Sequence, residues 1–491
     1  MLRKFYMDAG VMGLLSVVVR MKDLLAIPIL THYTGLELFG AWTQSGLLVA
    51  FAAPLIGLGL SQGFVRHAAG LDERKQVAML WALLAACAAM ALVVVALVYT
   101  LPGWLDTMLF GGSSAYRALV LIASLLVLVN PIRGSFESWF MIRGRARLVA
   151  GLRSSSVVVS LLLLIALTRI DVGFVPLIAA LALVEAVVAG GLCLWLLFRF
   201  GFVLPSFGWF REGFRYGLPL VPGQLSVLSV HFMDRLFISS YWGVSQVGVY
   251  AISYSVAQAV VILVTTPCRT IYEKSAFTYY NQQRYDDVRR MCQHTLGTTV
   301  AMGVPAVILL FLLSDAILVL LAPAEFGGAR QLMGIIGVSY LAQAITRINR
   351  VNIGMGSGTG RVLGILLVTF VTNTVLNFLL IPTYALWGGA LATLIAFAVS
   401  AVGSTWFAQR AFPCPMDRTL LWWVLWAGLA MIAAALGVRM VLGSSVDYPA
   451  LEWVLVGAAS VCAYGGVLYF GIGSSLLRLL KTDASDRQGD S

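Results

Sequence analysis

Long apolar stretches dominate this chain from Val11 to Tyr469, and polar loops separate them into fourteen segments. A helix needs about 20 apolar residues to cross the hydrocarbon core of a bilayer. Continuous apolar runs of that length indicate helices, which satisfy all their backbone hydrogen bonds internally. Charged residues make up only 11% of the chain, against about 25% in soluble domains. The sequence therefore predicts an all-α integral membrane protein with about fourteen transmembrane helices.

The predicted spans follow from the limits of the apolar runs. In chain order they are Val11–Thr31, Leu38–Leu60, Ala78–Leu101, Ala118–Trp139, Ser154–Thr168, Phe174–Phe198, Tyr216–Tyr241, Val247–Tyr272, Thr295–Leu321, Gln331–Asn349, Val362–Ile381, Leu386–Phe407, Thr419–Val438 and Leu451–Tyr469. The fifth is the weakest, because about 15 residues barely cross a hydrocarbon core.

Basic residues alternate between the predicted loops. Of the 33 Lys and Arg, 23 lie in the termini and even-numbered loops, and four lie in odd-numbered loops. Short loops rich in Lys and Arg stay in the cytoplasm. We therefore expect a multi-pass protein of a bacterial plasma membrane with both termini in the cytoplasm. The N-terminal run is interpreted as a first helix and not as a cleaved signal peptide, because it is too long and has no small-residue cleavage site. The net charge of +11 indicates topology and anionic lipid contact, not nucleic acid binding.

An internal repeat divides the chain. A shift of 208 residues aligns Gly35-Leu-Glu-Leu-Phe-Gly40-Ala-Trp42 with Gly243-Val-Ser-Gln-Val-Gly248-Val-Tyr250, and a shift of 214 aligns Gly144 with Gly358. The repeat predicts two parallel six-helix lobes, residues 1–200 and 201–410, followed by two further helices over 411–475. A disordered cytoplasmic tail is expected over 476–491. Repeats of this kind are typical of secondary transporters, which bind substrate between them.

Two segments resemble a known family. Residues 217–260, with a Pro-containing helix entry, an Asp-Arg pair and a GxxxVGxYxxxY turn, look like the start of the second lobe of polysaccharide-transport flippases. Residues 376–397, LNFLLIPTYALWGGALATLIAF, are similar to that family's hairpin of helices 11 and 12. The resemblance implies the MATE-like superfamily of multidrug, oligosaccharidyl-lipid and polysaccharide flippases, whose members alternate access between two lobes.

Ionisable residues within the predicted spans are candidates for function, because burying them in a membrane is unfavourable. The candidates for binding an anionic head group are Arg20, Lys22, Arg66, Arg235 and Arg269, and those for ion coupling are Asp23, His231 and Asp234. Basic residues outnumber acidic ones within the spans, which suits a diphosphate, since arginine binds phosphate with two hydrogen bonds. For each group the alternative is a structural ion network or, for Arg66 and Arg269, contact with the membrane surface.

The sequence has no motif for cofactor, metal or nucleotide binding. The six cysteines have no metal-ligand spacing. The Gly-rich run at residues 354–360 lacks the strand and lysine of a phosphate-binding loop. We therefore expect no cofactor and no catalysis.

The expected function is translocation of a polyprenyl-diphosphate-linked oligosaccharide for exopolysaccharide, capsule or O-antigen synthesis. Its partners would be that lipid-linked substrate, membrane lipids and a polymerase or export machinery. Polar and aromatic residues suited to a sugar are Gln44, Tyr250, Tyr254, Asn373 and Asn377, although helix-to-helix hydrogen bonds explain them equally well. The alternatives are a peptidoglycan-precursor flippase, a drug or cation antiporter of the same fold, and a membrane glycosyltransferase or polymerase. The enzyme alternative would require a larger extramembrane domain than the loops here, about 20 residues at most, provide.

Overall fold

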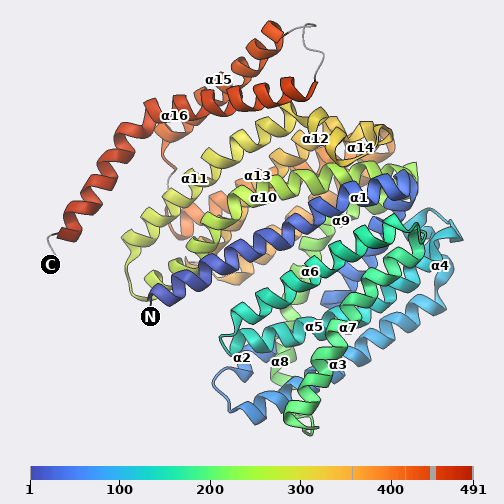
Figure 1. The fold of residues 1–491 in the computed structure, drawn as a ribbon. Coiled ribbons are helices and arrows are strands. Elements are labelled where there is room, and N and C mark those ends of the chain that lie inside the picture. The colour runs from blue at the N-terminus through green and yellow to red at the C-terminus, as the bar shows by residue number, and fades with distance from the viewer. Residues whose placement is uncertain (1, 357, 415, 443–448, 489–491) are drawn as a thin grey trace. The chain divides into compact units, whose positions relative to one another are not determined.

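The computed structural model describes the backbone over residues 2–356, 358–414, 416–442 and 449–488. Side chains are described over 24–273, 275–356, 358, 360–414, 416–442 and 450–471. Within these ranges the regular elements are all helices (Figure 1). The prediction of an all-α membrane fold is therefore confirmed.

The helices follow one another with short connections. In chain order they are α1 (Leu2–Gly57), α2 (Leu60–Ala68), α3 (Glu73–Thr100), α4 (Pro102–Phe110), η1 (Ser114–Tyr116), α5 (Arg117–Ile142), α6 (Ala146–Arg169), α7 (Phe174–Phe200), α8 (Phe210–Gly217), η2 (Leu218–Leu220), α9 (Val221–Trp242), α10 (Val244–Asn281), α11 (Tyr285–Leu312), α12 (Ser314–Leu321), η3 (Ala324–Ala329), α13 (Arg330–Gly356), α14 (Thr359–Ala411), α15 (Arg418–Leu442) and α16 (Pro449–Gln488).

Two of these helices are continuous in hydrogen bonding but broken in backbone geometry. Non-helical dihedral angles interrupt α1 at Gly35, with φ 70°, and α14 at Ala385, with φ 50°. Each break separates two of the predicted spans. Among the described residues, ten helices are long and apolar enough to cross a membrane. The helices α9 and α13 are more polar but, at 22 and 27 residues, are also long enough to cross.

Several predicted boundaries are wrong by one or two turns. The fifth span is not short, because α6 begins at Ala146 and includes arginines that the prediction assigned to a loop. The seventh span begins at Val221 and not at Tyr216, because η2, which contains Pro219, separates α8 from α9, and Pro222 lies in the first turn of α9. Proline lacks a backbone donor and favours the first turn of a helix over its interior.

The aligned glycines of the repeat have the same backbone conformation. Gly35 and Gly243 have φ of 70° and 87°, and Gly144 and Gly358 have φ of 67° and 83°. Side chains other than hydrogen are strained in this left-handed region. The repeat therefore conserves the conformation of the two turns, although the lobe boundaries themselves remain a prediction.

A second pair of aligned glycines lies where α1 crosses α10. A Cβ atom on Gly40 would overlap the carbonyl oxygen of Val244, and a Cβ on Gly248 would overlap that of Leu36. The shift of 208 that aligns Gly40 with Gly248 also aligns Leu36 with Val244. The contact is thus reciprocal, as expected where a local two-fold axis relates two copies of one element.

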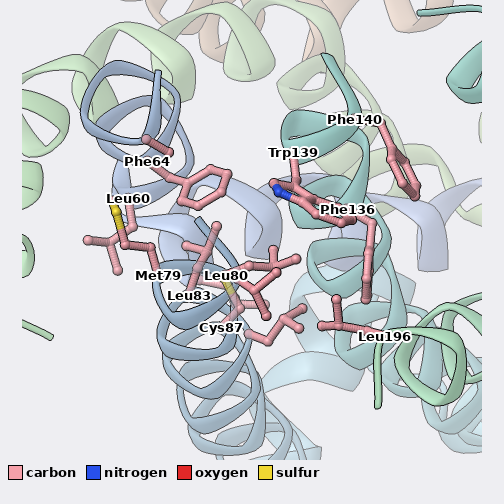
Figure 2. Packing of buried hydrophobic residues seen from close by; sticks show 14 of the residues in the cluster. Leu60, Phe64, Met79, Leu80, Leu83, Cys87, Phe136, Trp139, Phe140 and Leu196 are labelled. Carbon is pink, nitrogen blue, oxygen red and sulfur yellow. The ribbon is translucent and has the colours of Figure 1, made fainter. Parts of the chain in front are cut away.

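Contacts divide the chain into two compact units. Unit 1 comprises residues 1–255, 321–327 and 366–392, and unit 2 comprises residues 256–320, 328–365 and 393–491. Figure 2 shows part of the apolar core of unit 1, in which Phe64 of α2 and Leu80 and Leu83 of α3 lie opposite Phe136 and Trp139 of α5.

Candidate functional site

A polar cavity in unit 2 lies between α10, α11 and α13. Its volume is about 10 Å³, which is room for about one water molecule, and it is partly open to solvent. Its lining residues are Ile262, Thr265, Thr266 and Arg269 of α10, Thr299 of α11, and Tyr340, Gln343, Ala344, Arg347 and Ile348 of α13. On α10 and α13 the lining residues recur three or four positions apart, which places them on one face of each helix, whereas α11 contributes Thr299 alone. We call this cavity the arginine pocket.

Positive charge is concentrated at the arginine pocket. Arg269 donates to the Glu273 carboxylate one turn further along α10, with Nη1 and Oε1 2.9 Å apart. Arg347 enters the lining from α13. Arg350, one turn beyond it, is partly buried and close enough to Arg269 and Arg347 for their charges to repel. Three guanidinium groups therefore gather at this site, and the Glu273 carboxylate lies beside one of them, Arg269.

Hydroxyl and amide groups complete the lining of the arginine pocket. Thr265 donates its hydroxyl to the Val261 carbonyl at 2.7 Å, as polar residues do in apolar helices. The Thr299 hydroxyl is buried and has no hydrogen-bond partner among the described residues. A buried hydroxyl without a partner is unfavourable. A polar ligand atom in the pocket would give Thr299 that partner.

A second buried polar cluster lies in unit 1, around α9. Tyr250 donates to Asp234 at 2.6 Å, and the other carboxylate oxygen of Asp234 accepts from the Arg235 backbone at 2.8 Å. His231 Nδ1 lies 2.9 Å from the Tyr254 hydroxyl. The three residues predicted as functional on α9, His231, Asp234 and Arg235, are thus buried. Their side chains contact Tyr250 or Tyr254 of α10.

The Arg235 guanidinium lies over aromatic rings. Its central carbon is 5.2 Å from the Phe232 ring centre and 5.3 Å from that of Tyr254. Its Nε has no hydrogen-bond partner among the described residues. The Gln44 amide donates to the Arg235 carbonyl at 3.4 Å, and the Gln44 oxygen accepts no hydrogen bond from the part of the chain that the structure describes. Cation–π contact stabilises this charge without neutralising it.

Of the remaining sequence candidates, Arg66 belongs to neither cluster. Arg66 is exposed on α2 and stacks over Tyr216, 4.6 Å from its ring centre. The side chains of Arg20, Lys22 and Asp23 lie outside the described residues, as do those of the predicted tail.

Two further polar contacts involve residues within the predicted spans, and one of them also joins two helices. Arg133 pairs with Glu137 within α5 at 3.6 Å, and it also pairs with Glu185 of α7. Asn377 donates to Asn373 at 3.0 Å within α14. The sequence did not indicate Glu185, because its contact joins two helices far apart in the chain.

The lining residues Arg347, Thr299 and Gln343 were also not predicted as site residues. Their signal in the sequence is a polar face on α13, where Gln343, Arg347 and Arg350 are spaced by four and three. Within the described part of the chain, no group of three or more His, Cys, Asp or Glu side chains could hold a metal ion.

Comparison with known families identifies related sequences. The profile of the family described as "Polysaccharide biosynthesis protein" matches residues 6–272. The profile named MatE matches residues 219–383. The first match covers more than half of the chain.

Two curated relatives come from the archaeon Haloferax volcanii. The probable low-salt glycan biosynthesis flippase Agl15 is 22% identical over 240 residues, which are 49% of this chain and 50% of that protein. The probable flippase AglR is 24% identical over 196 residues, 39% of each chain. The chain thus matches half or less of the length of these relatives.

Solved structures share the fold. The lipid II flippase MurJ in an inward closed conformation has a TM-score of 0.79 and 14% identity, covering 95% of this chain and 99% of its own. An inward-facing multidrug resistance MATE family transporter of the MOP superfamily has a TM-score of 0.62 and 15% identity, covering 80% and 94%.

Proposed function

Because this chain belongs to the polysaccharide biosynthesis protein family, we propose that it is a flippase for lipid-linked oligosaccharides. The substrate is a polyprenyl diphosphate that carries an oligosaccharide repeat unit for exopolysaccharide, capsule or O-antigen synthesis. The protein moves this substrate across the plasma membrane and catalyses no covalent step. A polymerase or export machinery receives the product.

The chemistry of the arginine pocket supports this proposal, and the pocket has to open further to admit a diphosphate, since its present volume suits about one water molecule. A diphosphate presents several negatively charged oxygens, and Arg269 and Arg347 offer planar forks of donors to such oxygens. Thr299 adds a buried hydroxyl that needs a partner. The lipid tail can remain in the bilayer while the diphosphate and sugar occupy a polar path. A pocket built for a cationic drug would have the opposite charge.

Transport proceeds by alternating access of the two lobes, residues 1–200 and 201–410. Both termini lie in the cytoplasm, in accordance with the 23 basic residues on that side. The cationic groups of α1 and α9, which include Arg20, Lys22 and Arg235, accompany the anionic head group during passage. Protonation of His231 or Asp234 links the lobe equilibrium to the proton gradient.

A binding experiment tests the head-group assignment. The purified protein in detergent is titrated with a fluorescent polyprenyl diphosphate, with polyprenyl monophosphate and neutral polyprenol as matched competitors. We expect the diphosphate to compete best and the alcohol to fail. Equal competition by all three would contradict recognition of the diphosphate, since the lipid tail alone would then determine binding.

A further inference from the structure

The segment that joins α7 to α9, residues 201–220, has a backbone unsuited to the membrane interior. Residues 201–208 are not helical. One of their backbone groups, the amide of Ser206, donates to the Ala78 carbonyl at 3.1 Å. Lipid-exposed irregular backbone does not occur in hydrocarbon, because its polar groups would lack partners there. We call residues 201–220 the linker.

Three apolar side chains at the start of the linker are exposed, which is unfavourable in bulk water. Phe202, Leu204 and Phe207 are 66%, 80% and 51% exposed. Full burial of such a side chain is favourable by about 1.5–3 kcal/mol. An irregular backbone with exposed apolar side chains fits the boundary between head groups and acyl chains, where water reaches the backbone and lipid covers the side chains.

Contacts with neighbouring helices fix the linker at the level of an aromatic belt. The Phe202 ring lies 5.7 Å from the Trp81 ring, and the Trp209 ring lies 6.1 Å from the Phe64 ring in the core shown in part in Figure 2. Tryptophan is enriched at membrane interfaces. Ala78 and Trp81 lie within the first turns of α3, so the linker follows the membrane boundary.

The short helix α8 within the linker has one packed face and one charged face. Gly213 and Gly217 pack so closely on Gly63 and Gly59 of the α2 region that a Cβ atom at any of the four would overlap a neighbouring residue.

Arg211 and Arg215, one turn apart on α8, are exposed on the opposite side. Among the described residues, neither forms a salt bridge with an acid. Glu212 between them lies 3.6 Å from His67.

We propose that the linker is a binding surface for anionic phospholipid. Phe202, Leu204 and Phe207 enter the acyl boundary, while Arg211 and Arg215 bind phosphate head groups. The surface holds α8, and with it the end of α2, at the membrane. The assignment of this binding surface to the cytoplasmic leaflet rests on the proposed function. The binding of lipid by the linker does not depend on transport.

Depth-dependent quenching tests the insertion. An environment-sensitive fluorescent amino acid is incorporated at Leu204 or, as the matched control, at Glu212 in the full chain. The protein is placed in nanodiscs of phosphatidylcholine and phosphatidylglycerol that contain lipids with a spin label on the acyl chain just below the glycerol backbone. We expect quenching at position 204 to exceed that at 212 at least twofold. Equal quenching would overturn the insertion.

Lipid retention tests the head-group contact. The double variant R211Q/R215Q, purified from the same membranes, should retain less phosphatidylglycerol by native mass spectrometry than the wild type, with phosphatidylcholine unchanged. The pair R361Q/R410Q is the control, because these arginines stack over Phe407 and Trp406 outside the linker. An unchanged phosphatidylglycerol count in R211Q/R215Q would contradict anionic lipid binding at this surface.

Discussion

At the scale of single residues, the protein stabilises the charge of its arginines in two different ways. Arg269 has a carboxylate partner on its own helix, whereas Arg235 lies over the aromatic rings of Phe232 and Tyr254. A paired arginine near a cavity can exchange its partner for a ligand phosphate. An arginine held by rings retains its full charge for a passing anion.

The first prediction concerns the guanidinium groups of the arginine pocket. R269A and R347A should each weaken binding of a polyprenyl diphosphate about 10- to 100-fold, because hydrogen bonds to charged groups contribute roughly 1.5–3 kcal/mol. R269K and R347K should keep part of the affinity, since lysine retains the charge but not the fork. The measurement is the fluorescent-lipid titration in detergent.

R361A is the matched control for these variants, because Arg361 stacks over Phe407 and does not line the pocket. It should bind as the wild type does. If R269A and R347A also bind normally while remaining folded, the pocket does not hold the diphosphate.

The second prediction concerns coupling through the α9 cluster. An imposed proton gradient should accelerate transport in vesicles that contain the wild type, because His231 and Asp234 are buried on the same helix and both can exchange protons. H231Q and D234N should transport at a rate that no longer responds to the gradient. A wild type indifferent to the gradient would refute proton coupling and leave the flippase proposal intact.

At the scale of helices, the reciprocal glycine contact joins the two repeats. Leu36 and Val244 place carbonyl oxygens against the opposite glycine, so neither helix can carry a side chain at that point. The pattern of spans and turns was predictable from the sequence, because apolar length and glycine position are local signals. The exact helix starts were not, because helices such as α6 continue through arginines that the sequence indicates as loop residues.

The third prediction separates this contact from glycine content in general. G40A and G248A should lower the thermal unfolding temperature, because overpacking of a close contact is unfavourable by about 1–3 kcal/mol. G46A on the same helix has no heavy atom near its added Cβ and should be neutral or stabilising. Equal unfolding temperatures for G40A and G46A in detergent would contradict the close crossing.

At the scale of the whole molecule, the candidate site was only partly predictable. Arg269 and the α9 triplet stood out because charge is rare in apolar spans. Thr299, Gln343 and Arg347 did not, because polar residues on three helices form a pocket only after those helices pack. The prediction of Arg66 as a cavity residue remains untested, although the structure gives it an exposed position over Tyr216.

The fourth prediction concerns orientation. Reporters fused after Arg147 or Arg289 should report the cytoplasm, and a reporter fused after Ser113 should report the outside, because the basic loops remain inside. Dual-reporter activity in intact cells provides the measurement. The opposite sign at any of these positions would invalidate the proposed topology.

The most direct test of the proposed function is translocation itself. The purified protein is reconstituted in liposomes that carry a fluorescent polyprenyl-diphosphate oligosaccharide, and access of the sugar to an external glycosidase is followed over time. We predict that wild-type vesicles expose the inner half of the substrate, whereas empty vesicles and vesicles with R269A/R347A expose only the outer half. Protection of the inner half in wild-type vesicles, with the protein folded and correctly inserted, would contradict the flippase function.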